Sequence, residues 1–486
     1  MDEALTPSAI KSAVERYLDE HARAIALLND HIFYFGELGM QEFETAGLMT
    51  SLLEEAGFVV ERGLSGFPTG FCATYGSGAP VLAIHTEYDT NPDNSQQPWA
   101  VEATPIVMGA PGHCEGHNCN GAVLIAAAIA TRRAMERHGV KRTLKVFGAP
   151  AEEQLVSRPY FVRDGHFDDV DLAINPHVGS EFHLGYGVLQ SALVSATFHF
   201  HGETAHAGVA PWKGRDALDA VMLMDMGVAQ YREHMTPEMS CQRVITDGGH
   251  QPNVTPRHAA VWWYFRNSTA EGVSVLFEQA KKIAQGAALM TNTTLEVELH
   301  SAVWPVRCNE TLAGLIEREY SRIGAPRWGE DENTFAMDLQ KRAGVRDEGL
   351  RTSVKRNTGP SAQMRSANDA GDVSWKTPMA KLVFPSIVPN ISFHHWAAGA
   401  ALATSIAHKG VLAGAKVLAC SLIECFTNPL VVERARQRFA RETQDTPYYS
   451  LLPPDQKPPV HLNEKTMAAW RPAMKAHYLK EKPHFS

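Results

Sequence analysis

Residue types that bind divalent metals gather in the run GHCEGHN at 112–118. Glu115 and His117 flank Gly116 directly before the apolar helical run 121–135, so both side chains are expected in a tight turn at a helix N-terminus. Carboxylate and imidazole groups are ligands of Zn²⁺ and Mn²⁺. A bound divalent ion lowers the pKa of its water from about 15.7 toward 7, which makes a nucleophile for hydrolysis. The run therefore indicates a metal-dependent hydrolase.

A pair of carboxylates follows the apolar run TLKVFG at 143–148, which is typical of a buried strand. Ligand sites of open α/β sheets lie at the carboxyl ends of their strands. Because adjacent side chains at a strand end point in different directions, Glu153 is predicted to face the metal and Glu152 to act as general base on the water. The alternative for the pair alone is an acidic cluster favoured by the dipole of a following helix.

Two aspartates are candidates for orienting a metal-binding histidine through its second ring nitrogen. Asp89 ends the run HTEYD at 85–89. Asp372 lies in GDVSW at 371–375. Both are predicted to act on a ligand and not on the metal itself.

The elements around these residues alternate between strand and helix. Apolar runs at 71–75, 80–85, 143–148 and 171–175 predict strands, and 120–138 predicts a helix between two of them. Residues 8–57 are predicted to be helical, with a second helix from about Glu44 to near Gly57. This pattern is typical of an α/β fold with a mixed, mostly parallel sheet and helices on both faces.

The pattern changes near residue 192. Strands are predicted at 195–202, 257–266 and 294–301, with helices at 216–234 and 272–288, which together suggest an inserted α+β domain. The predicted organisation is a catalytic domain in two parts, 1–191 and 307–486, around an insertion at 192–306. Helices are expected at 310–323 and 406–426, and the tail after Gln444, with five prolines before residue 460, is expected to be irregular and on the surface.

The composition restricts the partners. With 45 basic and 54 acidic residues the formal charge is −9, which disfavours a nucleic acid or an anionic membrane and leaves a small-molecule substrate. Seven scattered cysteines fit a reducing cytosol better than a disulfide framework. The first 25 residues lack the features of a signal peptide, and the most apolar segment, 411–422, is shorter than a membrane span and contains Lys416. The expected location is the cytoplasm.

Several motifs, taken in order, resemble one known family. They are IHTEYD at 84–89, PGHCEGHN at 111–118, GAPAEE at 148–153, GETAHAGVAPWKGRDALDAV at 202–221, PNV at 252–254, GDVSW at 371–375 and SIAHKG at 405–410. The family is that of the metallopeptidases and amidohydrolases, which includes aminoacylases, glutamate carboxypeptidases and auxin-conjugate hydrolases. The resemblance implies amide hydrolysis by one or two divalent ions, Mn²⁺ or Zn²⁺, in a homodimer whose inserted domain serves for dimerisation and as a lid.

The resemblance also implies a ligand set. It comprises Glu115, His117, Glu153, His177 and His394. The family usually has cysteine where this chain has Glu115, and Cys114 is the rival candidate one position earlier. With two ions bound, Glu115 is the expected bridge. His394 matches the family motif better than its neighbour His395.

Further residues of the inserted domain are expected to meet the substrate. Related enzymes use the histidine at position 206 to stabilise the oxyanion, often in the active site of the opposite protomer. Asn253 falls in the PNV motif, and Arg266 ends the predicted strand at 257–266, where it is suited to bind a substrate carboxylate. The alternative for Arg266 is a surface salt bridge.

The sequence therefore predicts a metal-dependent amidohydrolase acting on an N-acyl amino acid, an aryl-acyl glutamate or a dipeptide-like conjugate. Two alternatives stay open. One is hydrolysis of another C–N bond, such as deamination of an aromatic amine. The other is a catalytically weak metal-binding regulatory relative, because the change from cysteine to Glu115 alters a metal ligand.

Overall fold

Three helices open the chain in this computed structural model, which describes residues 6–485. They are α1 (Pro7–Glu20), α2 (Ala22–Phe35) and α3 (Phe43–Glu55). The chain breaks at His21 and again after Gly36, whose left-handed backbone (φ 52°) ends α2. The predicted helical stretch is therefore divided twice where the sequence suggested one division.

A six-stranded sheet forms the centre of the larger part of the molecule. Its strands in spatial order are β1 (Val59–Arg62), β2 (Phe71–Gly76), β4 (Thr143–Gly148), β3 (Val81–Thr86), β5 (Leu172–Gly179) and β12 (Met379–Pro385). Neighbouring strands from β4 to β12 run parallel, and β1 and β2 add antiparallel strands at one edge. The predicted mixed, mostly parallel sheet is confirmed.

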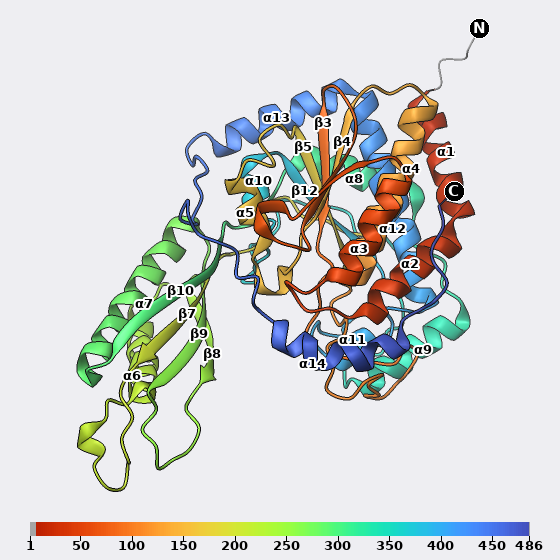
Figure 1. Cartoon of the computed structure of the whole chain (residues 1–486). Helices are drawn as coiled ribbons and strands as arrows, with labels where there is room; N and C mark the ends of the chain where they lie inside the picture. The colour runs from red at the N-terminus through yellow and green to blue at the C-terminus, as the bar shows by residue number, and fades with distance from the viewer. Residues whose placement is uncertain (1–5, 486) are drawn as a thin grey trace.

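Helices cover both faces of this sheet (Figure 1). Alternate residues of one strand enter different cores: Ile84 packs in the same cluster as Leu124 and Leu418, whereas Ala83 packs with Phe161. The first face carries α4 (His117–Arg137), α8 (Glu310–Ile323) and α12 (Ser405–Thr427), and the second carries α5 (Ser157–Arg163) and α10 (Gly371–Lys376). By length and composition α12 would pass for a membrane span, but 78% of its apolar window is buried inside the protein, as in a core helix.

A four-stranded antiparallel sheet extends from the larger part as an arm (Figure 1). Its order is β10 (Thr294–Val303), β7 (Ala192–His201), β9 (His258–Asn267) and β8 (Ser240–Asp247). Helices α6 (Ala217–Tyr231) and α7 (Ala270–Thr291) pack against it, and their buried side chains share a core with Phe198 and Phe265. The sequence did not predict β8, which is an edge strand with mostly exposed side chains.

The remaining elements surround the larger sheet. They are β6 (Gly187–Val188) paired with β11 (Arg307–Cys308), α9 (Glu330–Arg342), α11 (Trp396–Gly399), α13 (Pro429–Thr443) and α14 (Glu464–Met474). The prediction of an irregular surface tail after Gln444 was wrong for its second half. There α14 folds back, and its Met467 and Met474 are buried against Leu38 and Ala110.

Candidate metal centre

The turn that begins α4 presents Glu115 and His117. Gly116 between them has a left-handed backbone (φ 92°), and a Cβ there would lie 2.7 Å from Val178 Cγ1. Only glycine fits this close approach without strain. The predicted tight turn at a helix N-terminus is present, and it aims both neighbouring side chains toward the carboxyl ends of β3 and β5.

Asp89 fixes the orientation of His117. Its Oδ1 lies 3.3 Å from His117 Nδ1, and its backbone oxygen lies 3.2 Å from the same nitrogen. The other carboxylate oxygen accepts a hydrogen bond from the backbone N–H of Glu153 at 3.0 Å. The opposite ring nitrogen, His117 Nε2, is buried and has no hydrogen-bond partner within residues 6–485. That nitrogen is free to bind a cation.

Glu115 lies between two imidazoles. His394 Nε2 donates to Glu115 Oε2 at 2.7 Å and lies 3.3 Å from Glu153 Oε2. On the other side, His177 Nε2 lies 3.6 Å from Glu115 Oε1. The two carboxylate oxygens of Glu115 thus face different imidazoles, as a ligand that bridges two cations would.

The two rival ligands point elsewhere. The buried thiol of Cys114 donates to Asn91 Oδ1 at 3.2 Å. His395 Nδ1 accepts the backbone N–H of Ala397 and caps α11. The geometry therefore favours Glu115 over Cys114 and His394 over His395.

Glu152 and Glu153 lie in a short 3₁₀ turn, Glu152–Gln154, after β4. Glu152 Oε2 lies 3.7 Å from His117 Nε2, and its Oε1 accepts a hydrogen bond from Asn368 Nδ2 at 2.6 Å. The turn is separate from α5, which begins only at Ser157. The pair is therefore not the acidic first turn of a helix, and its two carboxylates face different partners.

A buried ion-pair network that the sequence did not reveal supports the centre from beneath. Glu87 Oε1 lies 3.5 Å from His177 Nε2, while its other oxygen pairs with Arg158. Arg158 also pairs with Asp369, and all three charged groups are fully buried. Glu87 precedes Asp89 by two positions in HTEYD, and that spacing beyond the end of β3 was the available signal.

Burial and neighbouring charges shift the acidity of these groups. Burial raises the pKa of Glu152 well above that of an ordinary carboxyl group. Burial also acts to raise the pKa of Glu115, but the hydrogen bond from His394 and the nearby imidazoles outweigh it and lower that pKa to about 2. Hydrogen bonds to Glu115 and Glu153 raise the pKa of His394 to about 10.

The donor set fits divalent metal. Glu115, His117 and Glu153 each offer a ligand atom within 4.8 Å of the others, and so do Glu87, His117 and His177. Glu153 Oε1 is buried without a hydrogen-bond partner in the described chain, like His117 Nε2. Carboxylates crowded together with unpaired buried lone pairs require positive charge between them.

The residues expected from the inserted domain lie at opposite ends of β9. His206 is exposed and forms a β-bridge with Val254, next to Asn253, in segments that Figure 1 shows at the end of the arm remote from the six-stranded sheet. Arg266 lies at the other end, where its guanidinium stacks 5.7 Å from the ring centre of Tyr264. The Tyr264 hydroxyl donates to the backbone oxygen of Glu153 at 3.4 Å, so Arg266 borders the metal centre.

The suggestion that Asp372 orients a histidine was wrong. Its carboxylate accepts hydrogen bonds from the backbone N–H of Trp304 at 3.0 Å and from the Tyr448 hydroxyl at 2.8 Å. Asp372 therefore ties the start of α10 to the end of β10 and to the C-terminal segment.

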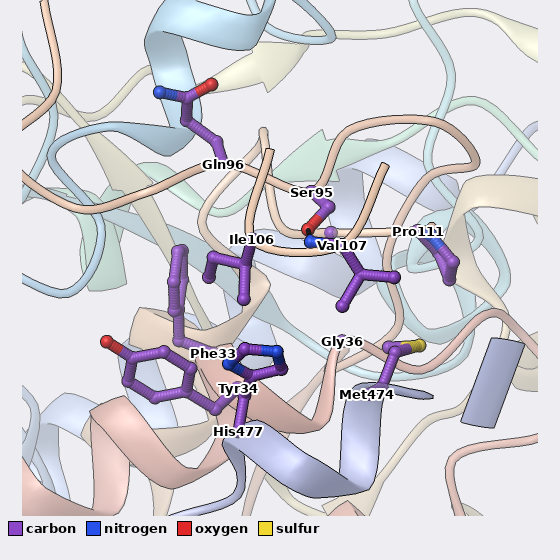
Figure 2. A pocket seen from close by; sticks show the side chains of 11 residues that line it. Phe33, Tyr34, Gly36, Ser95, Gln96, Ile106, Val107, Pro111, Met474 and His477 are labelled. Carbon is purple, nitrogen blue, oxygen red and sulfur yellow. Dashed lines mark hydrogen bonds between the residues drawn. The ribbon is translucent and has the colours of Figure 1, made fainter. Parts of the chain in front are cut away.

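A separate small pocket lies behind the metal loop (Figure 2). It is lined by side chains of α2, of the segment 95–112 and of the C-terminal helix, among them Phe33, Ile106 and Met474. None of the candidate ligands lines it. The reactive groups are thus elsewhere, at the carboxyl ends of the strands.

Comparison with known proteins matches this geometry. A model of the M20 peptidase dimerisation domain matches residues 189–290. The chain is 33% identical to the second of the two p-aminobenzoyl-glutamate hydrolase chains of Escherichia coli (strain K12), over 93% of this chain and 97% of that protein, and 26% identical to Xaa-Arg dipeptidase of Mus musculus, over 90% and 93%. A dinuclear metal-binding M20 peptidase from Bacillus subtilis shares the fold, with a TM-score of 0.53 and 18% identity over 84% of this chain and 98% of its own. The chain belongs to the M20 family of metal-dependent peptidases and amidohydrolases.

Proposed function

We propose that this enzyme hydrolyses the amide bond of an N-acyl amino acid, with an aryl-acyl glutamate or a dipeptide-like conjugate as the leading substrate class. The observation that carries the proposal is the carboxylate of Glu152 beside His117 in a cluster of metal-type ligands. The names of the E. coli and mouse relatives, a p-aminobenzoyl-glutamate hydrolase chain and a dipeptidase, support the substrate class.

We assign Glu115, His117, Glu153, His177 and His394 as the residues that hold one or two Mn²⁺ or Zn²⁺ ions. Bound metal supplies a water of lowered pKa and polarises the substrate carbonyl. Carboxylate oxygen in place of the usual thiolate favours harder ions, so Mn²⁺ is as suitable as Zn²⁺. Asp89 holds His117 in the tautomer that leaves Nε2 free.

Glu152 is the proposed general base. Its Oε2 faces His117 Nε2, while Asn368 fixes its Oε1. Burial raises its pKa, which suits a carboxyl group that must take a proton from water and then return it to the leaving amine. Such a group contributes typically ~10²–10⁴-fold to the rate.

His206 and Asn253 act in the active site of the opposite protomer in this proposal. They lie together at the end of the arm, remote from their own metal centre. The edge strand β8 is free on one side, and Val244 and Ile245 on it are exposed, as are Met222 and Met226 on α6. An apolar edge of this kind suits a homodimer interface, and 192–306 is the proposed extent of the domain that forms it.

Arg266 is the proposed site for the substrate carboxylate. It borders the metal centre through Tyr264. No carboxylate within residues 6–485 forms an ion pair with it, and its Nε and Nη1 contact only the side-chain oxygen of Gln242 and the backbone oxygen of Arg365. An unpaired guanidinium beside the reaction centre can bind a carboxylate bidentately. Seven buried free cysteines support the proposed cytoplasmic location.

The test is an assay of purified enzyme with p-aminobenzoyl-glutamate, other N-acyl amino acids and dipeptides, with bound metal measured on the same sample. Release of the free amino acid, lost on chelation and restored by Mn²⁺ or Zn²⁺, is the expected result. Release of ammonia from an aromatic amine would instead identify a deaminase. Metal binding without any amine release would identify a regulatory relative.

A further inference from the structure

Three histidines gather on the face of the arm sheet that α6 and α7 leave uncovered. His199 and His201 lie on β7, and the strand register places His201 directly opposite His258 on β9. Since side chains two residues apart share a face, His199 joins them. Their side chains are 23%, 46% and 33% exposed, respectively, so solvent reaches all three.

Two of these rings meet nitrogen to nitrogen. His199 Nδ1 lies 3.2 Å from His258 Nε2, with the ring centres 5.5 Å apart. His201 lies beside them, its ring centre 5.1 Å from that of His258. Two imidazole nitrogens bound to one tetrahedral ion at about 2.0–2.1 Å each would lie about 3.3–3.4 Å apart. The observed separation is close to that value.

Carboxylates hold the outer nitrogens of the same two rings. Asp247 Oδ2 lies 2.7 Å from His258 Nδ1, and Glu298 Oε2 lies 3.2 Å from His199 Nε2. A carboxylate accepts, so each outer nitrogen carries the N–H in the neutral ring. The inner nitrogens then present lone pairs to each other, and this contact repels unless a cation lies between them. A carboxylate that orients a histidine from behind is typical of metal sites.

We propose that His199 and His258, with His201 as third ligand, form a binding site for an imidazole-preferring divalent ion, Zn²⁺, Ni²⁺ or Cu²⁺. Asp247 and Glu298 orient the two rings. The site lies on β7 and β9 of the arm and shares no residue with the catalytic centre. A hard ion such as Mg²⁺ prefers oxygen ligands and does not compete.

Zinc binding to the holoenzyme tests the proposal. Bound Zn²⁺ is measured by equilibrium dialysis and elemental analysis for the wild type, His199→Gln and His258→Gln. The matched control is His234→Gln, an exposed histidine elsewhere in the same domain. The wild type and the control should bind one more Zn²⁺ per chain than either cluster variant, while the catalytic activity of all four proteins stays equal.

A weaker change separates a metal site from a proton shared between the two rings. Asp247→Asn should keep the extra Zn²⁺ but lower its affinity by about 10–100-fold, the usual effect of losing such an orienting carboxylate. Crystals grown with Zn²⁺ should show an anomalous peak between His199 and His258. Equal zinc content in the wild type and both cluster variants would overturn the proposal and leave a hydrogen-bonded histidine pair. Testing the two histidines separately leaves one variant to decide if the other folds poorly.

Discussion

Glu152 and Glu153 are neighbours in the chain, yet their carboxylates serve different partners. Glu153 faces His394 and receives a hydrogen bond from it, whereas Glu152 faces His117 and Asn368. The left-handed backbone of Ala151 before the turn and of Leu155 after it produces this divergence. One residue can then hold metal while the other moves a proton.

Changing Glu152→Gln should leave the metal content unchanged and reduce kcat by ~10² or more, because a neutral amide cannot accept a proton from water. Elemental analysis and steady-state kinetics measure both quantities. Glu136→Gln, which alters an exposed acid on α4, is the control. A Glu152→Gln enzyme with near-normal kcat would exclude Glu152 as the base.

The replacement of the family's cysteine gives a second prediction. Glu115→Ala should lower metal affinity and activity together, because it removes a charged ligand between His177 and His394. Glu115→Cys should retain more metal than Glu115→Ala and shift preference toward Zn²⁺, the softer ion. Cys114→Ser should leave metal content almost unchanged, since its thiol contacts Asn91. Loss of metal only in Cys114→Ser would reverse the assignment.

Ligand types were readable from the sequence, but their supporting charges were not. GHCEGHN and AEE indicate metal chemistry because few other roles need such groups beside glycine turns. Glu87, Arg158 and Asp369 come from three distant segments, and each alone is typical of a solvated surface charge. Only the fold shows that they are buried together, where their mutual pairing offsets the cost of desolvation.

At the scale of elements, the predicted strands and helices mostly match because their apolar periods are strong. Strand 143–148 and helix 310–323 have the observed bounds. The edge strand β8 was missed because its exposed side chains follow no apolar alternation. The second half of the tail was missed because α14 is anchored by distant contacts to α2 and the segment before the metal loop.

The length of β9 separates Arg266 from Asn253 and His206, so one chain alone does not complete the proposed site. Co-expression of Glu152→Gln with His206→Ala should therefore yield heterodimers in which one site of the two is whole. Their activity should approach about half that of the wild-type dimer, while each homodimer stays nearly inactive. Two different affinity tags isolate the heterodimer for assay. Inactive heterodimers would indicate that His206 acts within its own chain.

At the scale of the whole molecule, the C-terminal segment supports the region that leads into the metal loop. Met474 lies beside Gly36 and Pro111 in the pocket of Figure 2, and Met467 is buried near Ala110. Arg471 pairs with the fully buried Glu37 and donates to the backbone oxygen of Gln41 at 2.8 Å. The ends of the chain thus stabilise a loop that begins far from either of them in sequence.

Replacing Arg471 by Met should lower the free energy of unfolding by about 3–5 kcal/mol at neutral pH, because it leaves the Glu37 carboxylate buried and unpaired. Burial already raises the pKa of Glu37 in the wild type, and loss of the guanidinium raises it further. Thermal and denaturant unfolding measure the loss. Arg23→Met is the control, since its pair with Glu481 is exposed.

The pH dependence of that loss identifies its cause. A carboxyl group whose pKa is higher in the folded state binds its proton more tightly there, so stability falls as pH rises from its unfolded value, about 4.3, through its folded value. The Arg471→Met deficit should therefore be smaller at pH 5 than at pH 8, because protonation removes the buried charge. In the Glu37→Gln background the same substitution should cost less and lose this pH dependence. A deficit that is equal at both pH values in either background would attribute the loss to packing of the arginine stem.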